Sequence, residues 1–130
     1  MSQPLAAAIV HAKDIARLAH FYAEVAELEV MHEVADHIVL ESENLELVIV
    51  AIPEPAASRI VISTPPARRE NTAFKLVFMV ASLAEAREIA AAAGGGLNGP
   101  DKEWDFQGAR VCDGFDPEGN VIQLRAYPED

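Results

Sequence analysis

The sequence predicts an α+β domain made of two copies of a strand–helix–three-strand unit, and three observations support this prediction. Two runs of apolar residues at three- and four-residue spacing each follow a helix-capping residue, Asp14 in the first half and Ser82 in the second. Each helical run is preceded by one strand-like run and followed by three. Aligning Ser82 with Asp14 also aligns Lys75 with Ala7, so the second half repeats the pattern of the first.

Module one, residues 4–52, begins with an apolar run that ends just before the capping residue Asp14. Apolar residues then recur on one helical stripe, and three runs of strand-forming residues follow, separated by short polar turns. The predicted elements are a strand over residues 5–11, a helix over 15–28, and strands over 28–34, 37–41 and 45–51.

Module two, residues 73–130, follows a linker over residues 53–72. The linker contains four prolines, which remove backbone donors, so we expect at most an edge pairing over residues 60–62. In module two the glycines after the helix are expected to end it, and Gly119 is expected to take the left-handed position of a hairpin turn. The predicted elements are a strand over residues 74–80, a helix over 83–93, and strands over 97–102, 109–115 and 120–127.

Composition narrows the classes of partner. A length of 130 residues fits one domain with one core. The formal net charge of -11 disfavours nucleic acid and anionic membranes as partners and favours a cationic ligand. The sequence shows no secretory signal, no apolar run long enough to span a membrane, and one cysteine, Cys112, which predicts a cytoplasmic protein.

Two segments resemble the vicinal oxygen chelate superfamily. One is Asp14-Ile15 opening a helix that contains Phe21-Tyr22, and the other is Asp116-Pro117-Glu118-Gly119-Asn120-Val121-Ile122-Gln123-Leu124. The superfamily includes glyoxalase I, extradiol dioxygenases, and fosfomycin and bleomycin resistance proteins. The resemblance implies paired βαβββ modules that form an open curved mixed sheet with helices on the convex side, usually within a homodimer.

Metal-dependent members of the superfamily carry one ligand on the first strand of each module and one on a later strand. The corresponding positions here are Ala7, Glu46, Lys75 and Gln123. Ala7 has no donor atom, and a protonated Lys75 repels a cation, so only Glu46 and Gln123 can act as ligands. We therefore expect no metal and no other cofactor. A change of register brings in His11, which strand alternation leaves four residues from Ala7 and toward the rim.

Alternation along the strands predicts which side chains face the concavity and which pack under the helices. The concave set is Ala7, Ile9, His11, Glu46, Val48, Val50, Lys75, Val77, Met79, Val121, Gln123 and Arg125. The set under the helices is Leu45, Leu47, Ile49, Phe74, Leu76 and Phe78.

The expected ligand site is a small polar centre in an apolar cup. In this hypothesis Lys75 is paired with Glu46 and hydrogen-bonded by Gln123; the alternative is that Lys75 extends to water and acts as scaffold. Trp104 with Phe106, in a polar loop or strand edge, is a candidate ligand platform; the alternatives are packing in the dimer interface or in the core. His11 lies at the rim.

The predicted function is a metal-free, bleomycin-resistance-like protein that binds a small organic molecule, with a homodimer as the expected assembly. The alternative is a lyase, isomerase or dioxygenase of the glyoxalase-like type that acts on a small oxygenated substrate. In a metal-free lyase or isomerase, Lys75 or Glu46 would serve as the acid or base.

Overall fold

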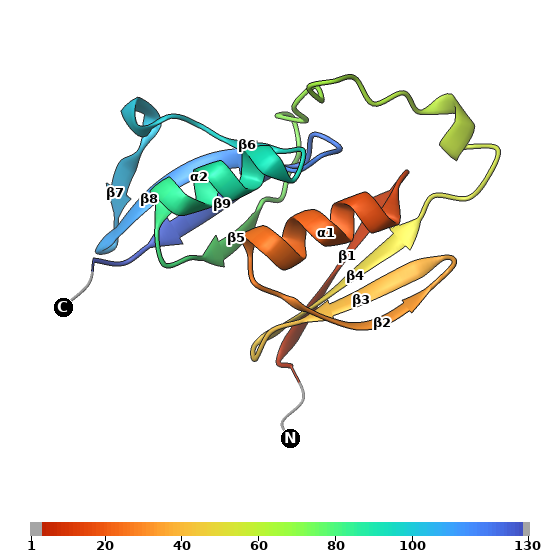
Figure 1. Cartoon of the computed structure of the whole chain (residues 1–130), viewed down its shortest axis with the longest axis horizontal. Helices are drawn as coiled ribbons and strands as arrows, with labels where there is room; N and C mark the ends of the chain where they lie inside the picture. The colour runs from red at the N-terminus through yellow and green to blue at the C-terminus, as the bar shows by residue number, and fades with distance from the viewer. Residues whose placement is uncertain (1–3, 129–130) are drawn as a thin grey trace.

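The computed structural model describes residues 4–128 and confirms the two strand–helix–strand units; the order of elements is as predicted in module one, and module two has one more short strand, β7, than predicted (Figure 1). Module one contains β1 (Ala6–Ala12), α1 (Ile15–Val25), β2 (Glu29–Val34), β3 (His37–Glu41) and β4 (Leu45–Ala51). Module two contains β5 (Leu76–Met79), α2 (Leu83–Ala92), β6 (Gly96–Leu97), β7 (Trp104–Phe106), β8 (Ala109–Phe115) and β9 (Val121–Ala126). Two short 3-10 helices, Ala57–Arg59 and Pro100–Lys102, lie in the linker and after β6.

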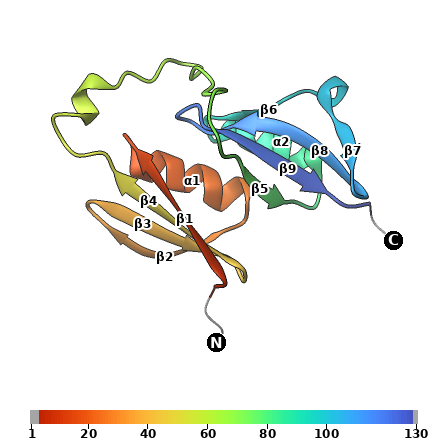
Figure 2. The same cartoon turned by 180° about the vertical axis from the view of Figure 1, so that it is seen from behind.

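Each module forms its own open mixed sheet, as the view from behind shows (Figure 2). The strand order is β1-β4-β3-β2 in module one and β5-β9-β8-β6 in module two, with β7 paired to β8. The first strand of each module is parallel to its neighbour, and the other pairs are antiparallel. The predicted α+β fold class with paired βαβββ modules is confirmed, with one open mixed sheet in each module; the edge strands β1 and β5 are not paired with each other within residues 4–128.

Both helices begin at the predicted caps. The side chain of Asp14 accepts a hydrogen bond from the Arg17 N–H at 3.1 Å, and that of Ser82 accepts one from the Glu85 N–H at 3.2 Å. Helix α1 ends at Val25 rather than near residue 28, because Glu27 adopts a positive φ of 56° and redirects the chain into β2. Neither helix has the length and apolar sequence needed to cross a bilayer.

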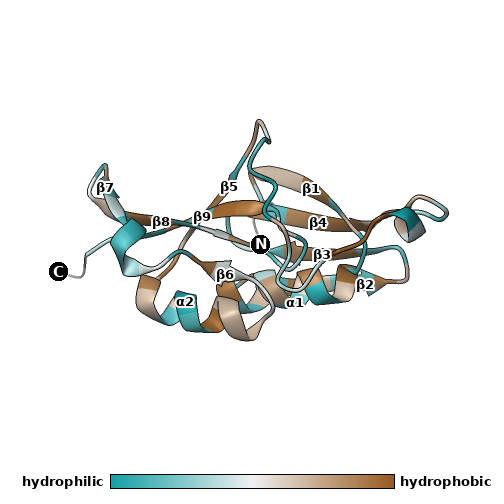
Figure 3. Ribbon diagram, turned by 90° about the horizontal axis from the view of Figure 1, so that it is seen from above, coloured by the Kyte–Doolittle hydropathy of each residue, from teal (hydrophilic) through white to brown (hydrophobic). Residues whose placement is uncertain are grey.

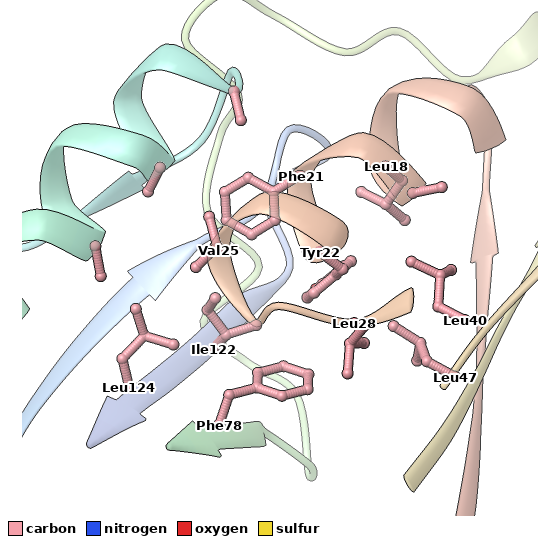
Figure 4. Close-up of a cluster of buried hydrophobic side chains, with 14 of the residues drawn as sticks. Leu18, Phe21, Tyr22, Val25, Leu28, Leu40, Leu47, Phe78, Ile122 and Leu124 are labelled. Atoms are coloured by element: carbon pink, nitrogen blue, oxygen red, sulfur yellow. The ribbon is translucent and has the colours of Figure 1, made fainter. Parts of the chain in front are cut away.

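The core lies between the helices and one face of each sheet (Figure 4). Phe21 and Tyr22 of α1 are fully or almost fully buried, and the Tyr22 ring centroid lies 5.6 Å from that of Phe78 in module two. The two modules therefore share one hydrophobic core. The residues labelled in Figure 4 are Leu18, Phe21, Tyr22, Val25, Leu28, Leu40, Leu47, Phe78, Ile122 and Leu124.

The predicted packing under the helices is confirmed for Leu47, Ile49 and Phe78 and is wrong for Phe74. Phe74 is 89% exposed because β5 begins only at Leu76, which leaves Phe74 in the preceding irregular segment, outside the strand alternation.

Two predicted strand segments are also wrong. Residues 60–62 form no strand, and the linker instead touches the second sheet at Arg69, whose N–H donates to the Gly119 carbonyl at 2.8 Å. The strand expected over residues 97–102 ends at Leu97, because Pro100 has no N–H and starts a 3-10 turn.

The turn at residues 116–120, between β8 and β9, joins module two to helix α1. Asp116 is completely buried, and its Oδ2 accepts a hydrogen bond from the Tyr22 hydroxyl at 2.7 Å. Glu118 accepts hydrogen bonds from the Lys13 N–H at 2.8 Å and the Asp14 N–H at 2.7 Å, at the start of α1. The acidic residues of this turn thus fix the orientation of one module relative to the other.

Candidate functional site

Each sheet has one face away from the helices, which we call the open face of its module (Figure 3). On module one, the register aligns Ala7 with Glu46 and Glu46 with Glu41, so two carboxylates lie side by side. The next row is apolar and contains Ile9, Val48 and Val39. Ile9 is 65% exposed, so this open face is uncovered in the single chain.

The open face of module two carries a chain of polar contacts that runs from Lys75, just before β5, to β8 and β9. The Lys75 amine lies 3.0 Å from Asp113 Oδ2, and the Gln123 amide Nε2 donates to Asp113 Oδ1 at 3.3 Å. The Gln123 Oε1 in turn accepts a hydrogen bond from Arg125 Nε at 2.8 Å. Asp113 therefore orients the Gln123 amide, and Gln123 orients Arg125.

The expected ion pair between Lys75 and Glu46 is not the one that forms, because the Lys75 amine pairs with Asp113 on β8 of its own module. The Lys75 side chain keeps 40% of its surface exposed, so the ion pair is at the open surface rather than buried. Glu46 lies on the other module, where it lines a cavity of about 270 Å³ with Leu5, Ala7 and Glu41. Within one chain, Lys75 and Gln123 are joined through Asp113, and Glu46 is separate from them.

His11 lies near the unpaired edges of β1 and β5. It lines a cavity of about 570 Å³ between the two sheets, and Ile9, Arg69, Phe74 and Asn120 are among the other residues that line this cavity. The predicted rim position is consistent with this location, because His11 is exposed and lies in the row after Ile9 on β1.

Trp104 belongs to the short edge strand β7, which ion pairs attach to the rest of module two. Glu103, just before β7, binds Arg87 at 2.6 Å and Arg110 at 3.1 Å, and the hydrogen bond from Arg87 lowers the pKa of the Glu103 carboxyl. Trp104 pairs with Val111, and Val111 pairs with Arg125, so Trp104 shares the open face with Arg125. Trp104 remains 39% exposed there.

The residues at the four positions marked by the resemblance do not fit a divalent metal ion. The Lys75 ammonium is a cation without a lone pair, and Gln123 already uses its oxygen to accept a hydrogen bond from Arg125. Ala7 offers no donor atom. In the part of the chain that the structure describes, no cluster of three or more His, Cys, Asp or Glu residues could hold a metal ion.

His32 and His37 face each other across the β2–β3 turn, with ring centroids 5.5 Å apart. His37 Nδ1 lies 2.8 Å from Asp36 Oδ1. This pair lacks the third ligand that a metal site needs, so it adds no second candidate centre.

Asp113 is the functional candidate that sequence reasoning missed. Its neighbours Cys112 and Gly114 are buried against the helix side, so alternation places Asp113 on the open face beside Gln123. The sequence contains this signal, but the neighbour of Lys75 depends on how β5, β9 and β8 lie next to one another, which is a property of the tertiary fold.

Comparison with known proteins identifies the family. The model of the glyoxalase-like domain family matches residues 7–125. No curated protein matches the chain.

Solved structures show the same fold at low sequence identity. A glyoxalase/bleomycin resistance protein/dioxygenase family enzyme from Burkholderia phytofirmans PsJN has 18% identity and a TM-score of 0.70, over 97% of this chain and 100% of that chain. A glyoxalase-related enzyme from Fulvimarina pelagi has 19% identity and a TM-score of 0.67, over 98% and 90%. The fosfomycin resistance protein FosX from Listeria monocytogenes has 17% identity and a TM-score of 0.65, over 98% and 96%.

The family match includes both modules, the linker and the 116–120 turn that joins them. The structural matches extend over nearly the same residues and share the paired-module architecture. The chain therefore belongs to the glyoxalase-like domain family, within the vicinal oxygen chelate superfamily.

Proposed function

We propose that this chain is a metal-free member of its family that binds a small organic molecule between open sheet faces, as a homodimer. The observation that carries the proposal is the contact chain from Lys75 through Asp113 to Gln123 on an open face that also has exposed apolar side chains. Two of its members occupy positions that hold a metal in metal-dependent relatives. In this chain the amine of Lys75, paired with Asp113, stands in place of the metal ion. A few polar groups surrounded by apolar side chains are the usual composition of a ligand site.

The homodimer is proposed because both open faces have exposed apolar side chains in one chain. Ile9 on module one and Met79 on module two are 65% and 55% exposed. Exposed apolar surfaces rimmed by polar groups commonly mark an interface. The second copy is the favoured occupant because the carboxylates Glu41 and Glu46 on module one complement the partly exposed amine of Lys75 on module two.

A cytoplasmic location is part of the same proposal. Its support is that Cys112 is the single cysteine and is buried, so the fold does not depend on an intrachain disulfide.

Metal content and ligand binding test the first part. We expect substoichiometric nickel, zinc and manganese in freshly purified protein, and no loss of the melting temperature on treatment with a chelator. In a thermal-shift screen of amines, carboxylates and α-keto acids, a ligand at about one hundred times its Kd should raise Tm by roughly 5 °C or more.

The same screen tests the role of Lys75. Lys75→Met should abolish the shifts produced by the ligands found, while its own Tm stays near that of the wild type, because the lost ion pair is partly exposed. Lys102→Met, an exposed lysine outside the open face, is the matched control and should keep every shift. If Lys75→Met binds the ligands normally, Lys75 has only a structural role. If the protein contains stoichiometric metal that is required for turnover, the enzymatic alternative is favoured.

Light scattering after gel filtration tests the homodimer. The wild type should elute with twice the 14.0 kDa mass of the chain. Ile9→Glu places a third carboxylate beside Glu46 on the open face and should give a monomer. Ile89→Glu changes a comparably apolar exposed residue on α2 and should leave the dimer intact. A monomeric wild type, or an unaffected Ile9→Glu dimer, would contradict this arrangement.

A further inference from the structure

We propose that Arg125 binds the carboxylate of the ligand, and that the ligand is a small carboxylic acid with an apolar or aromatic body. This inference rests on the proposed binding function and assigns the chemical class of its ligand. It concerns the end of the open face of module two that contains β7, away from Lys75.

The Arg125 guanidinium is held in a fixed orientation by two contacts. Its Nε donates to Gln123 Oε1 at 2.8 Å, and its Cζ lies 5.0 Å from the centre of the Phe106 ring. The Gln123 amide cannot turn to release Arg125 without losing its bond to Asp113. A guanidinium that is already oriented loses little rotational freedom when it binds a ligand.

The two terminal nitrogens of the Arg125 guanidinium are the donors that lack a hydrogen-bond acceptor within residues 4–128. Within residues 4–128 they form no hydrogen bond, and Arg125 has no carboxylate partner. The side chain is nevertheless partly buried, where an uncompensated charge is costly. A carboxylate is the complementary group, because its two oxygens match the fork of guanidinium donors.

The residues around Arg125 indicate the rest of the ligand. The register places Met79 on one side of Arg125 and Val111, followed by Trp104, on the other. Met79 and Trp104, which are 55% and 39% exposed, offer apolar and aromatic surface next to the cation, whereas Val111 is fully buried. Although the whole-chain charge of -11 favours a cationic ligand, the Arg125 guanidinium has no ion-pair partner within residues 4–128 and favours an anion next to it.

Trp104 provides a direct measurement, because it is the only tryptophan in the chain and shares the face with Arg125. The full chain is titrated with phenylacetate and with phenethylamine, which have the same ring and opposite charges. Phenylacetate is expected to change the Trp104 fluorescence saturably, and phenethylamine is expected to bind at least about tenfold more weakly.

Variants assign the effect to the guanidinium. Arg125→Gln should weaken phenylacetate binding by about tenfold or more, and Arg125→Lys should recover only part of it, because an ammonium cannot form the two parallel bonds. Arg59→Gln removes the same charge from the exposed 3-10 turn of the linker and should leave binding unchanged. Light scattering on each variant reports the oligomeric state.

Each remaining outcome overturns the inference. If phenethylamine binds and phenylacetate does not, the proposed binding function stands and the carboxylate class is wrong. If Arg125→Gln binds phenylacetate normally, another residue recognises the anion. If Arg125→Gln separates the dimer without changing affinity, Arg125 instead pairs with the acidic face of the second copy. If neither probe nor any compound of the thermal-shift screen binds, the proposed function fails as well.

Discussion

Replacing Asp116 with alanine is expected to lower the free energy of unfolding by about 3 kcal/mol or more, because a buried carboxylate is removed from several donors. Its Oδ1 accepts from the Glu118 and Asn120 N–H groups, and its Oδ2 accepts from the Tyr22 hydroxyl and the Asn120 side chain. Alanine leaves these donors without an acceptor at a site closed to water. Urea unfolding followed by circular dichroism measures the change.

Two further variants show whether the loss comes from this network. Tyr22→Phe removes only one of the hydrogen bonds and should cost about 1 kcal/mol. Asp105→Ala removes an aspartate whose side chain is 84% exposed and should change stability little. An Asp116→Ala protein as stable as Asp105→Ala would show that the turn does not brace the two modules.

The acid side of the stability profile gives an independent test of the same carboxyl. Burial raises the pKa of Asp116 above its ordinary value, although hydrogen bonds from Tyr22 and Asn120 oppose the shift. The folded state therefore binds this proton more tightly than the unfolded state, whose pKa is about 3.9. The contribution of Asp116 to the free energy of unfolding should therefore fall as the pH rises from the unfolded-state pKa through the higher folded-state pKa. Above the folded-state pKa this contribution should stay constant.

The measurement is the difference in free energy of unfolding between the wild type and Asp116→Asn as a function of pH. The difference should decrease with rising pH in the acid range and be flat near neutrality. A difference that increases with pH would mean that the hydrogen bonds outweigh burial and lower the pKa.

Gly119→Ala is the second change with a large expected effect, also about 3 kcal/mol. Gly119 has a φ of 86°, where a side chain is strained, and an added β-carbon would overlap the carbonyl oxygen of Ala67 in the linker. The linker cannot move away easily, because the Arg69 N–H donates to the Gly119 carbonyl. Denaturant unfolding should show this loss of stability, while the circular dichroism spectrum of the folded variant should match that of the wild type.

Gly108→Ala separates backbone strain from the overlap. Gly108 has nearly the same φ, 83°, but an added β-carbon there would meet no atom within 4 Å. It should therefore cost only about 1 kcal/mol, the price of the left-handed conformation. Equal losses for the two variants would mean that the contact with Ala67 is unimportant.

Local patterns were sufficient to predict the repeated architecture. The Asp14 and Ser82 caps, the buried alternation of Leu47 and Ile49, and the left-handed Gly119 all follow from residues close together in the sequence. The predicted bounds of β3 and β4 agree with the structure for the same reason.

Contacts between distant segments could not be predicted in this way. The partner of Lys75 is Asp113, which is 38 residues away and reached only because β9 lies between β5 and β8. The exposure of Phe74 depends on where β5 begins, and β7 depends on ion pairs of Glu103 with Arg87 and Arg110. The local sequence around Asp116 and Glu118 predicts a hairpin turn, whereas their hydrogen-bond partners Tyr22 and Lys13 lie in the other module and are not predicted by it.

The bracing of helix α1 by the 116–120 turn has a consequence for how the polypeptide can be divided. Since the Tyr22 hydroxyl and the Lys13 N–H are bound by side chains of module two, the covalent connection through the linker is not the main attachment between the halves. Coexpressed as separate fragments cut near residue 63, the halves should reassemble in trans. Reassembly of the two fragments should then depend on the side chains of Asp116 and Glu118.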